Sequence, residues 1–217
     1  MAGVTPNGHG LNNSDSGIIC PVPNPNGQYT GWQYRLDNSE SGRYRWATSV
    51  TKKRQTAPTA HLKNGELPIA FCRPMDGVTD SSSIGLAEGV GFKPEIAANR
   101  TGQIVLGAAG GNFSGSSETF RHYLERASIE LGTKNVILYA DAGAVSNPHV
   151  LRRYAETQKV LEAQGYSLYI GWWEQTAKTA DDIDEIKDIK VIKTISPSEF
   201  FQIGRELSGY YPDPNNR

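Results

Sequence analysis

The chain has 217 residues, with 22 lysine and arginine residues against 23 aspartate and glutamate residues. That length suits one domain of ordinary size with a smaller appendage, and the balanced charge by itself neither favours nor excludes a polyanionic partner. No apolar stretch reaches transmembrane length and the polar N-terminal region lacks a signal-peptide core, so the sequence predicts a cytoplasmic protein without a membrane partner. Cys20 and Cys72 are far apart in sequence, which indicates neither a zinc site nor a disulfide framework.

The first part of the chain is rich in Gly, Asn, Pro and Ser, and Ile18 and Ile19 are its one adjacent aliphatic pair. Such a composition supplies too few apolar side chains for a core. We therefore expect residues 1–30 to form an irregular N-terminal arm.

Residues 31–80 are predicted to form a β-rich appendage. Aromatic and apolar residues alternate with polar ones at 32–36, and aromatic residues alternate with arginine at 43–46. The turn-like segment NSESG lies between these two runs, at 38–42. This pattern is typical of an antiparallel β-hairpin.

The appendage is also basic, with seven Lys or Arg residues between Arg35 and Lys63 against Asp37 and Glu40. Cations contact phosphates and aromatic rings stack on bases, so this composition suits nucleic acid. The expected contacts are Arg43, Arg45, Lys52 and Lys53. An ordinary solvated hairpin with a half-buried aromatic face explains the same pattern equally well.

From residue 81 to residue 217 the chain alternates between predicted strands and helices. Apolar runs at 84–87, 103–106, 136–140 and 167–173 read as strands, and amphipathic segments between them read as helices. Repeated strand-helix-strand units predict an α/β domain whose mostly parallel sheet is flanked by helices.

Carboxylates follow several of these strands. Glu88 and Asp141 each end an apolar run shortly before a glycine, and Asp182 and Asp184 lie in an acidic loop after the last long strand. Open parallel sheets place ligands at the carboxyl ends of their strands, so we expect these acids to converge. Converging carboxylates repel one another unless a divalent cation with oxygen ligands relieves them, and Mg²⁺ or Mn²⁺ is the simplest choice.

Six short segments follow one another along the chain: WQYR at 32–35, AHLKNGELP at 60–68, LAEG at 86–89, GAAGG at 107–111, YADAG at 139–143 and DIDE at 182–185. Their order resembles the Toprim domain of bacterial primases, topoisomerases and related nucleases. More narrowly, it resembles the Toprim-like domain of large replication proteins from cyanobacterial plasmids, in which the domain precedes a helicase-type ATPase region.

The resemblance implies roles for individual residues. Glu88 matches the glutamate that acts as general acid or base at a phosphodiester, and Asp141 matches the first of two metal-holding aspartates. Gly143 stands where the second aspartate is expected. Asp182 or Asp184 could replace that ligand, in which case the metal would bind weakly or with the help of the substrate. An aspartate at position 143 would restore the ligand if the backbone there accepts a side chain.

Two further cations, Lys93 and Arg100, are candidate phosphate contacts, although most surface lysines and arginines are neutral in this respect. Plainer interpretations exist for the acids as well. Glu88 and Asp141 could cap helices, and the segment 181–185 could be a solvated acidic loop. The GAAGG turn lacks the lysine of a phosphate-binding P-loop, which favours a tight structural turn.

Three functions are consistent with the sequence. The leading hypothesis is a metal-dependent Toprim-like domain that acts on DNA or RNA in plasmid DNA replication, in association with priming, on single-stranded or primer-template nucleic acid. The second is a catalytically inactive scaffold that binds nucleic acid and positions a linked helicase, which the substitution at Gly143 supports. The third is a Toprim-type nuclease or nickase, because the same acidic centre serves bond breaking and bond making.

Overall fold

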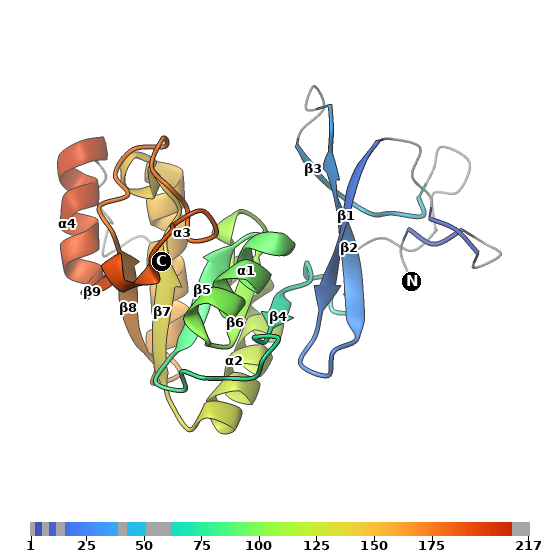
Figure 1. The fold of residues 1–217 in the computed structure, drawn as a ribbon, viewed down its shortest axis with the longest axis horizontal. Coiled ribbons are helices and arrows are strands. Elements are labelled where there is room, and N and C mark those ends of the chain that lie inside the picture. Colours follow the sequence, from blue (N-terminus) through green and yellow to red (C-terminus); the bar gives the residue numbers. More distant parts are fainter. Residues whose placement is uncertain (1–2, 6–8, 12–15, 39–42, 51–61, 210–217) are drawn as a thin grey trace.

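The computed structural model describes residues 3–5, 9–11, 16–38, 43–50 and 62–209. They form a six-stranded sheet flanked by helices and a separate three-stranded antiparallel sheet near the N-terminus (Figure 1). The predicted α/β class, with its mostly parallel sheet and antiparallel appendage, is confirmed. Within the described ranges, no helix has both the length and the apolar character needed to cross a bilayer.

The larger sheet has the strand order β4-β6-β5-β7-β8-β9. Its four central strands are parallel, and the two edge strands β4 and β9 run antiparallel to their neighbours. The strands are β4 (Ala70–Cys72), β5 (Ile84–Glu88), β6 (Val105–Ala108), β7 (Asn135–Tyr139), β8 (Ser167–Trp172) and β9 (Lys193–Ile195). The α-helices are α1 (Phe92–Thr101), α2 (Ser117–Leu131), α3 (Pro148–Glu162) and α4 (Pro197–Ser208). The 3₁₀ turns are η1 (Ala109–Gly111), η2 (Ser114–Ser116), η3 (Ala144–Ser146) and η4 (Ile189–Val191).

Helices cover both faces of this sheet because its strands are apolar on both sides. In β5, Leu86 belongs to one buried cluster and Ala87 to the other, as the two-residue period of a strand requires. The Leu86 side packs against α2, α3 and α4, and the Ala87 side packs against α1. The helix ends follow local chemistry: Asn147 and Ser196 accept hydrogen bonds as N-caps of α3 and α4, and α2 ends at the left-handed Gly132.

The smaller sheet has the order β1-β2-β3, with β1 at Gly17–Pro23, β2 at Tyr29–Leu36 and β3 at Tyr44–Trp46. The predicted hairpin is present as the antiparallel pair of β2 and β3. The expectation that residues 1–30 are irregular is wrong for β1. The segment NPNG at 24–27 makes a hairpin turn there, because the Asn24 side chain accepts hydrogen bonds from the amides of Asn26 and Gln28.

A second correction concerns β4, which lies inside the segment 31–80 that the sequence assigns to the appendage. β4 pairs with β6 and therefore belongs to the six-stranded sheet. All three of its side chains are buried, so both faces of the strand must be covered. The larger sheet, which has helices on both faces, provides that cover, whereas a small exposed sheet does not.

The two sheets contact each other directly. Val22 of β1 is fully buried in the same cluster as Ala87 and Val105 of the larger sheet. Arg73, just after β4, donates to the Pro25 carbonyl of the β1-β2 turn and makes a bidentate pair with Glu130 of α2, at 2.8 and 2.9 Å. Apolar packing and one guanidinium thus join the appendage to the α/β unit.

Candidate acidic site at the sheet edge

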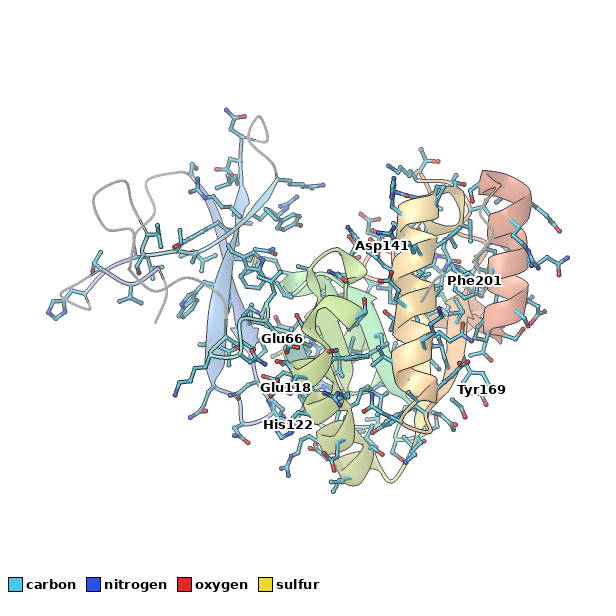
Figure 2. All side chains as sticks on the ribbon, turned by 180° about the vertical axis from the view of Figure 1, so that it is seen from behind. Glu66, Glu118, His122, Asp141, Tyr169 and Phe201 are labelled. Atoms are coloured by element: carbon cyan, nitrogen blue, oxygen red, sulfur yellow. The ribbon has the colours of Figure 1, made fainter. Side chains whose placement is uncertain are left out.

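Glu88 and Asp141 lie at the carboxyl ends of adjacent parallel strands. Glu88 is the last residue of β5, and Asp141 follows the end of β7 by two residues. The chain leaves β5 toward α1 on one face of the sheet and leaves β7 toward α3 on the other. Such a divergence is the topological switch point at which open α/β sheets bind ligands. Figure 2 shows Asp141 at one end of the α/β unit.

The acidic loop reaches the same edge because two apolar side chains anchor it. Ile183 and Ile186 are buried in the cluster beside α1, and the Trp173 indole N–H donates to the Asp181 carbonyl at 2.8 Å. Between these anchors, Asp182 accepts a hydrogen bond from the Ala142 amide at 2.7 Å. Asp182 therefore lies directly against the loop that carries Asp141.

Lys93, in the first turn of α1, joins these two acids. Its Nζ atom lies 2.9 Å from Asp141 Oδ2 and 2.7 Å from Asp182 Oδ2. The three side chains are 20 to 25% exposed, so water screens them only in part. Sequence reasoning named Lys93 as a phosphate contact, but the structure places its ammonium between two carboxylates. The position of Lys93, five residues after Glu88, gave no signal of this because its partners are distant in sequence.

Asp141 has a strongly raised pKa within this group of side chains. Burial first, and then the nearby Glu88 carboxylate, raise the pKa of Asp141 to about 7, although Lys93 acts in the opposite direction. Burial disfavours the charged form of Lys93, but the carboxylates of Asp141 and Asp182 outweigh it and raise the pKa of the ammonium above its usual value. The charges of Glu88, Asp182 and Lys93 therefore all act on the Asp141 carboxyl group.

Tyr154 of α3 is a residue of this centre that sequence reasoning missed. Its side chain is 1% exposed, its hydroxyl makes no hydrogen bond that meets normal geometry among the described residues, and it lies beneath the glycine turn beside Gly111. Burial first, and then the charges of Asp141 and Glu88, raise the pKa of the hydroxyl far above its usual value. The amphipathic pattern of this segment explains why Tyr154 is buried, but it gives no sign that the hydroxyl lies close to the acids.

These side chains do not fit a preformed magnesium site. Among the described residues, no three His, Cys, Asp or Glu side chains are placed to hold a metal ion together. The Oδ2 atoms of Asp141 and Asp182 are already engaged by the Lys93 ammonium. Asp141 Oδ1 is buried and makes no hydrogen bond within the described ranges, so it is the one carboxylate oxygen of these two aspartates without a described partner.

Gly143 has no room for the missing aspartate. Its φ angle is +74°, in the left-handed region, and a Cβ atom there would lie 2.9 Å from the Lys178 amide nitrogen and 2.7 Å from its Cγ. An aspartate at position 143 could restore the ligand only if the backbone there accepted a side chain, and this backbone does not. The second carboxylate is therefore excluded by the local fold.

The structure also describes four of the other predicted site residues. The Asp184 Oδ1 atom is buried and makes no hydrogen bond among the described residues. Arg100 donates to the Ile186 carbonyl, so it ties α1 to the acidic loop. Arg43 and Arg45 are exposed, the first next to β3 and the second within it. Lys52 and Lys53 lie outside the described residues.

The glycine turn after β6 brings backbones together. A Cβ atom at Gly107 would lie 2.4 Å from the Gly89 carbonyl oxygen, so the turn after Glu88 and the end of β6 approach at a distance that a side chain would forbid. Arg153 of α3 donates to the Gly110 carbonyl at 2.9 Å and holds the turn from the other side.

No family model matches this sequence, and a search of curated proteins gives no match. Among solved structures, the primase of Aquifex aeolicus, in a crystal structure of its zinc-binding and RNA polymerase domains, matches 97% of this chain with a TM-score of 0.52. The two sequences are 14% identical, and the match spans 51% of that primase chain. At this identity the likeness concerns the fold, and the chain therefore has a fold similar to that of a primase.

Proposed function

We propose that the chain is a Toprim-like nucleic-acid-binding domain that acts in priming-associated plasmid DNA replication, and that Lys93 serves as the resident cation of its acidic centre. The observation that carries the proposal is the Lys93 ammonium, within 3 Å of both Asp141 and Asp182. The primase-like fold and the motif order, from LAEG at 86–89 to DIDE at 182–185, support the assignment to replication.

A divalent ion that binds Asp141 and Asp182 must first displace Lys93. That step breaks two charge-assisted hydrogen bonds and leaves the ammonium to find new partners. Gly143 cannot supply a compensating carboxylate. The expected consequence is a weak affinity for divalent ions and a binding function that does not depend on them.

The partner that suits this domain is single-stranded or primer-template DNA or RNA. The centre itself carries three carboxylates against one ammonium, so it repels phosphates, and the attraction must come from elsewhere on the chain. The basic appendage is the natural source. A linked helicase-type ATPase region, which the resemblance to plasmid replication proteins implies, would use the domain to position the strand.

A metal-dependent enzyme, priming or cleaving, is the second candidate, and one observation favours it. Asp141 Oδ1 is buried and uncommitted, and its carboxyl group lies close enough to Glu88 for the two charges to interact. A hard divalent ion would satisfy that oxygen and relieve the repulsion if Lys93 moved aside. Asp184, the remaining predicted metal ligand, stays a prediction for this second candidate.

The two candidates differ in how they respond to Mn²⁺ and to the loss of Lys93. Isothermal titration with MnCl₂ compares the wild type, Lys93→Met and the control Lys178→Met, which removes an exposed lysine that lies against Gly143. We expect no measurable binding by the wild type and the control, and new binding by Lys93→Met, because three carboxylates then lack a cation. A rise in the melting temperature of Lys93→Met with Mn²⁺ provides a second readout if the variant is unstable.

Nucleic-acid binding is measured in parallel, as the fluorescence anisotropy of a labelled oligo(dT) strand in EDTA. Binding of the strand without divalent ions supports the proposed function. Tight Mn²⁺ binding by the wild type, together with strand binding that requires Mn²⁺, would overturn it in favour of the enzyme.

A further inference from the structure

The strand register of the small sheet assigns its side chains to two faces. Residues directly opposite one another share a face, and residues alternate between faces along each strand. Ile18, Arg35 and Tyr44 are opposite one another across β1, β2 and β3, and so form a single row. Cys20, Gln33 and Trp46 form the next row on the same face.

The row of Cys20, Gln33 and Trp46 is packed against the α/β unit. The Cys20 side chain lies against Gly91, the N-cap of α1, close enough that a Cβ at Gly91 would meet it at 2.9 Å. Trp46 packs against the buried cluster that contains Ala97 of α1. This part of the face therefore ends at the first turn of α1, two residues before Lys93.

The row of Ile18, Arg35 and Tyr44 is one step further from the α/β unit and is open. Ile18 is 44% exposed and Tyr44 is 52% exposed, and Arg35 is half-buried. The opposite face is used differently. There, Tyr34, Leu36 and Ala47 form a small buried cluster of their own.

We propose that a single strand of DNA or RNA crosses the open row of Ile18, Arg35 and Tyr44 on the small sheet. The exposed Tyr44 ring offers a stacking surface for a base, the Arg35 guanidinium on the neighbouring strand offers a cation for the adjoining phosphate, and Ile18 gives an apolar flank. The row also lies outside the acidic centre, where phosphates are repelled. The proposal rests on the proposed function and names the surface that performs it.

The register provides a charge-matched comparison. Arg45, which is opposite Tyr34, lies on the other face of the same sheet, one residue from Tyr44. Arg35→Ala and Arg45→Ala remove the same charge from the same small sheet, so the general electrostatic attraction falls equally. They differ in the face from which the cation is lost. For the aromatic arm, Tyr44→Ala is compared with Tyr169→Ala, an exposed tyrosine of β8 in the α/β unit (Figure 2).

Binding of labelled oligo(dT) in EDTA is measured for the four variants over a range of salt concentrations. We expect Arg35→Ala to weaken binding about tenfold and to reduce the salt slope by about one, as the loss of one phosphate contact does. Tyr44→Ala should weaken binding by roughly five- to a hundredfold, the range for one stacked base. Tyr169→Ala should stay within about twofold of the wild type. Arg45→Ala, which removes a cation that the sequence also predicts to contact nucleic acid, should weaken binding less than Arg35→Ala does.

Equal losses in Arg35→Ala and Arg45→Ala would overturn the proposal, because the strand would then sense only the overall charge of the sheet. A larger loss in Arg45→Ala would place the strand on the opposite face and would overturn it as well. If the wild type fails to bind any strand, the proposed function itself is wrong. The four thermal unfolding curves show whether a lost affinity reflects lost folding.

Discussion

The two sheets of this chain place functional groups by different means. In the six-stranded sheet the strands are buried on both faces, and the polar groups Glu88 and Asp141 gather where parallel strands end. In the three-stranded sheet the strands are antiparallel, and the alternation of side chains separates Arg35 from Arg45 onto opposite faces. In the first case the topology decides which residues meet, and in the second the register does. Substitutions at Gly143 and Asp141 test the packing and the charge at the edge of the larger sheet, and a substitution at Glu66 tests the segment that joins the two sheets.

The largest expected effect is at Gly143, where the edge of the larger sheet admits no side chain. Gly143→Ala should lower the free energy of unfolding by about 3 kcal/mol, from a strained left-handed residue plus a clash with the Lys178 backbone. Gly132→Ala is the matched control, because Gly132 has a similar φ of +70° and open space around it. It should cost about 1 kcal/mol. Urea unfolding at neutral pH measures both, and equal losses would mean that the crowding at Gly143 relaxes freely.

The second prediction concerns the repulsion within the acidic centre. The pKa of Asp141 is raised from 3.8 to about 7, so over that interval the folded chain holds a proton that the unfolded chain releases. Stability from this group therefore falls as the pH rises through that interval. Asp141→Asn cannot ionise and should be more stable than the wild type by about 2 kcal/mol at pH 8, and nearly equal to it at pH 4.

The control is Asp181→Asn, which changes an exposed carboxylate of the same acidic loop. Thermal unfolding of the three proteins across this pH range gives the comparison. If Asp141→Asn is less stable than the wild type at pH 8, the pair with Lys93 outweighs burial and the Glu88 charge.

The smallest effect is expected at Glu66, in the segment that leads from the small sheet to the large one. Its carboxylate accepts hydrogen bonds from the amides of Glu118 and Thr119, both at 2.8 Å, at the start of α2. Burial opposes the charge, but these hydrogen bonds outweigh it and lower the pKa of Glu66. Its stabilising effect is therefore present above the usual glutamate pKa and is lost as the pH falls.

Glu66→Gln should cost about 1 kcal/mol at neutral pH, the usual value of a charged helix cap, and less in acid. Glu125→Gln, an exposed change further along α2, should be neutral. Urea unfolding at the two pH values measures both variants. A pH-independent loss at Glu66 would mean that shape, and not charge, matters at this cap.

Sequence patterns could predict much of the larger sheet because its strands are short apolar runs with long amphipathic helices between them. They also placed Glu88 and Asp141 at strand ends, and parallel pairing then brings these residues to one edge. The partnership of Lys93 with Asp182 could not be read from the sequence, since 89 positions separate them and the contact depends on Ile183 and Ile186 anchoring the loop. In the small sheet, the sequence did not predict β1. The composition of residues 1–30, rich in Gly, Asn, Pro and Ser, indicated an irregular arm, although the segment NPNG at 24–27 is typical of a hairpin turn.

The antiparallel edge strand β4 has a practical consequence for dissecting the protein. A chain shortened to begin at residue 81 would keep every predicted strand of the larger sheet but lose β4, which pairs with β6. β6 would keep its pairing with β5, but its other edge between Val105 and Gly107 would be unpaired, next to side chains that are fully buried in the intact sheet. Such an edge recruits other strands, so the shortened chain should aggregate where the 217-residue chain does not.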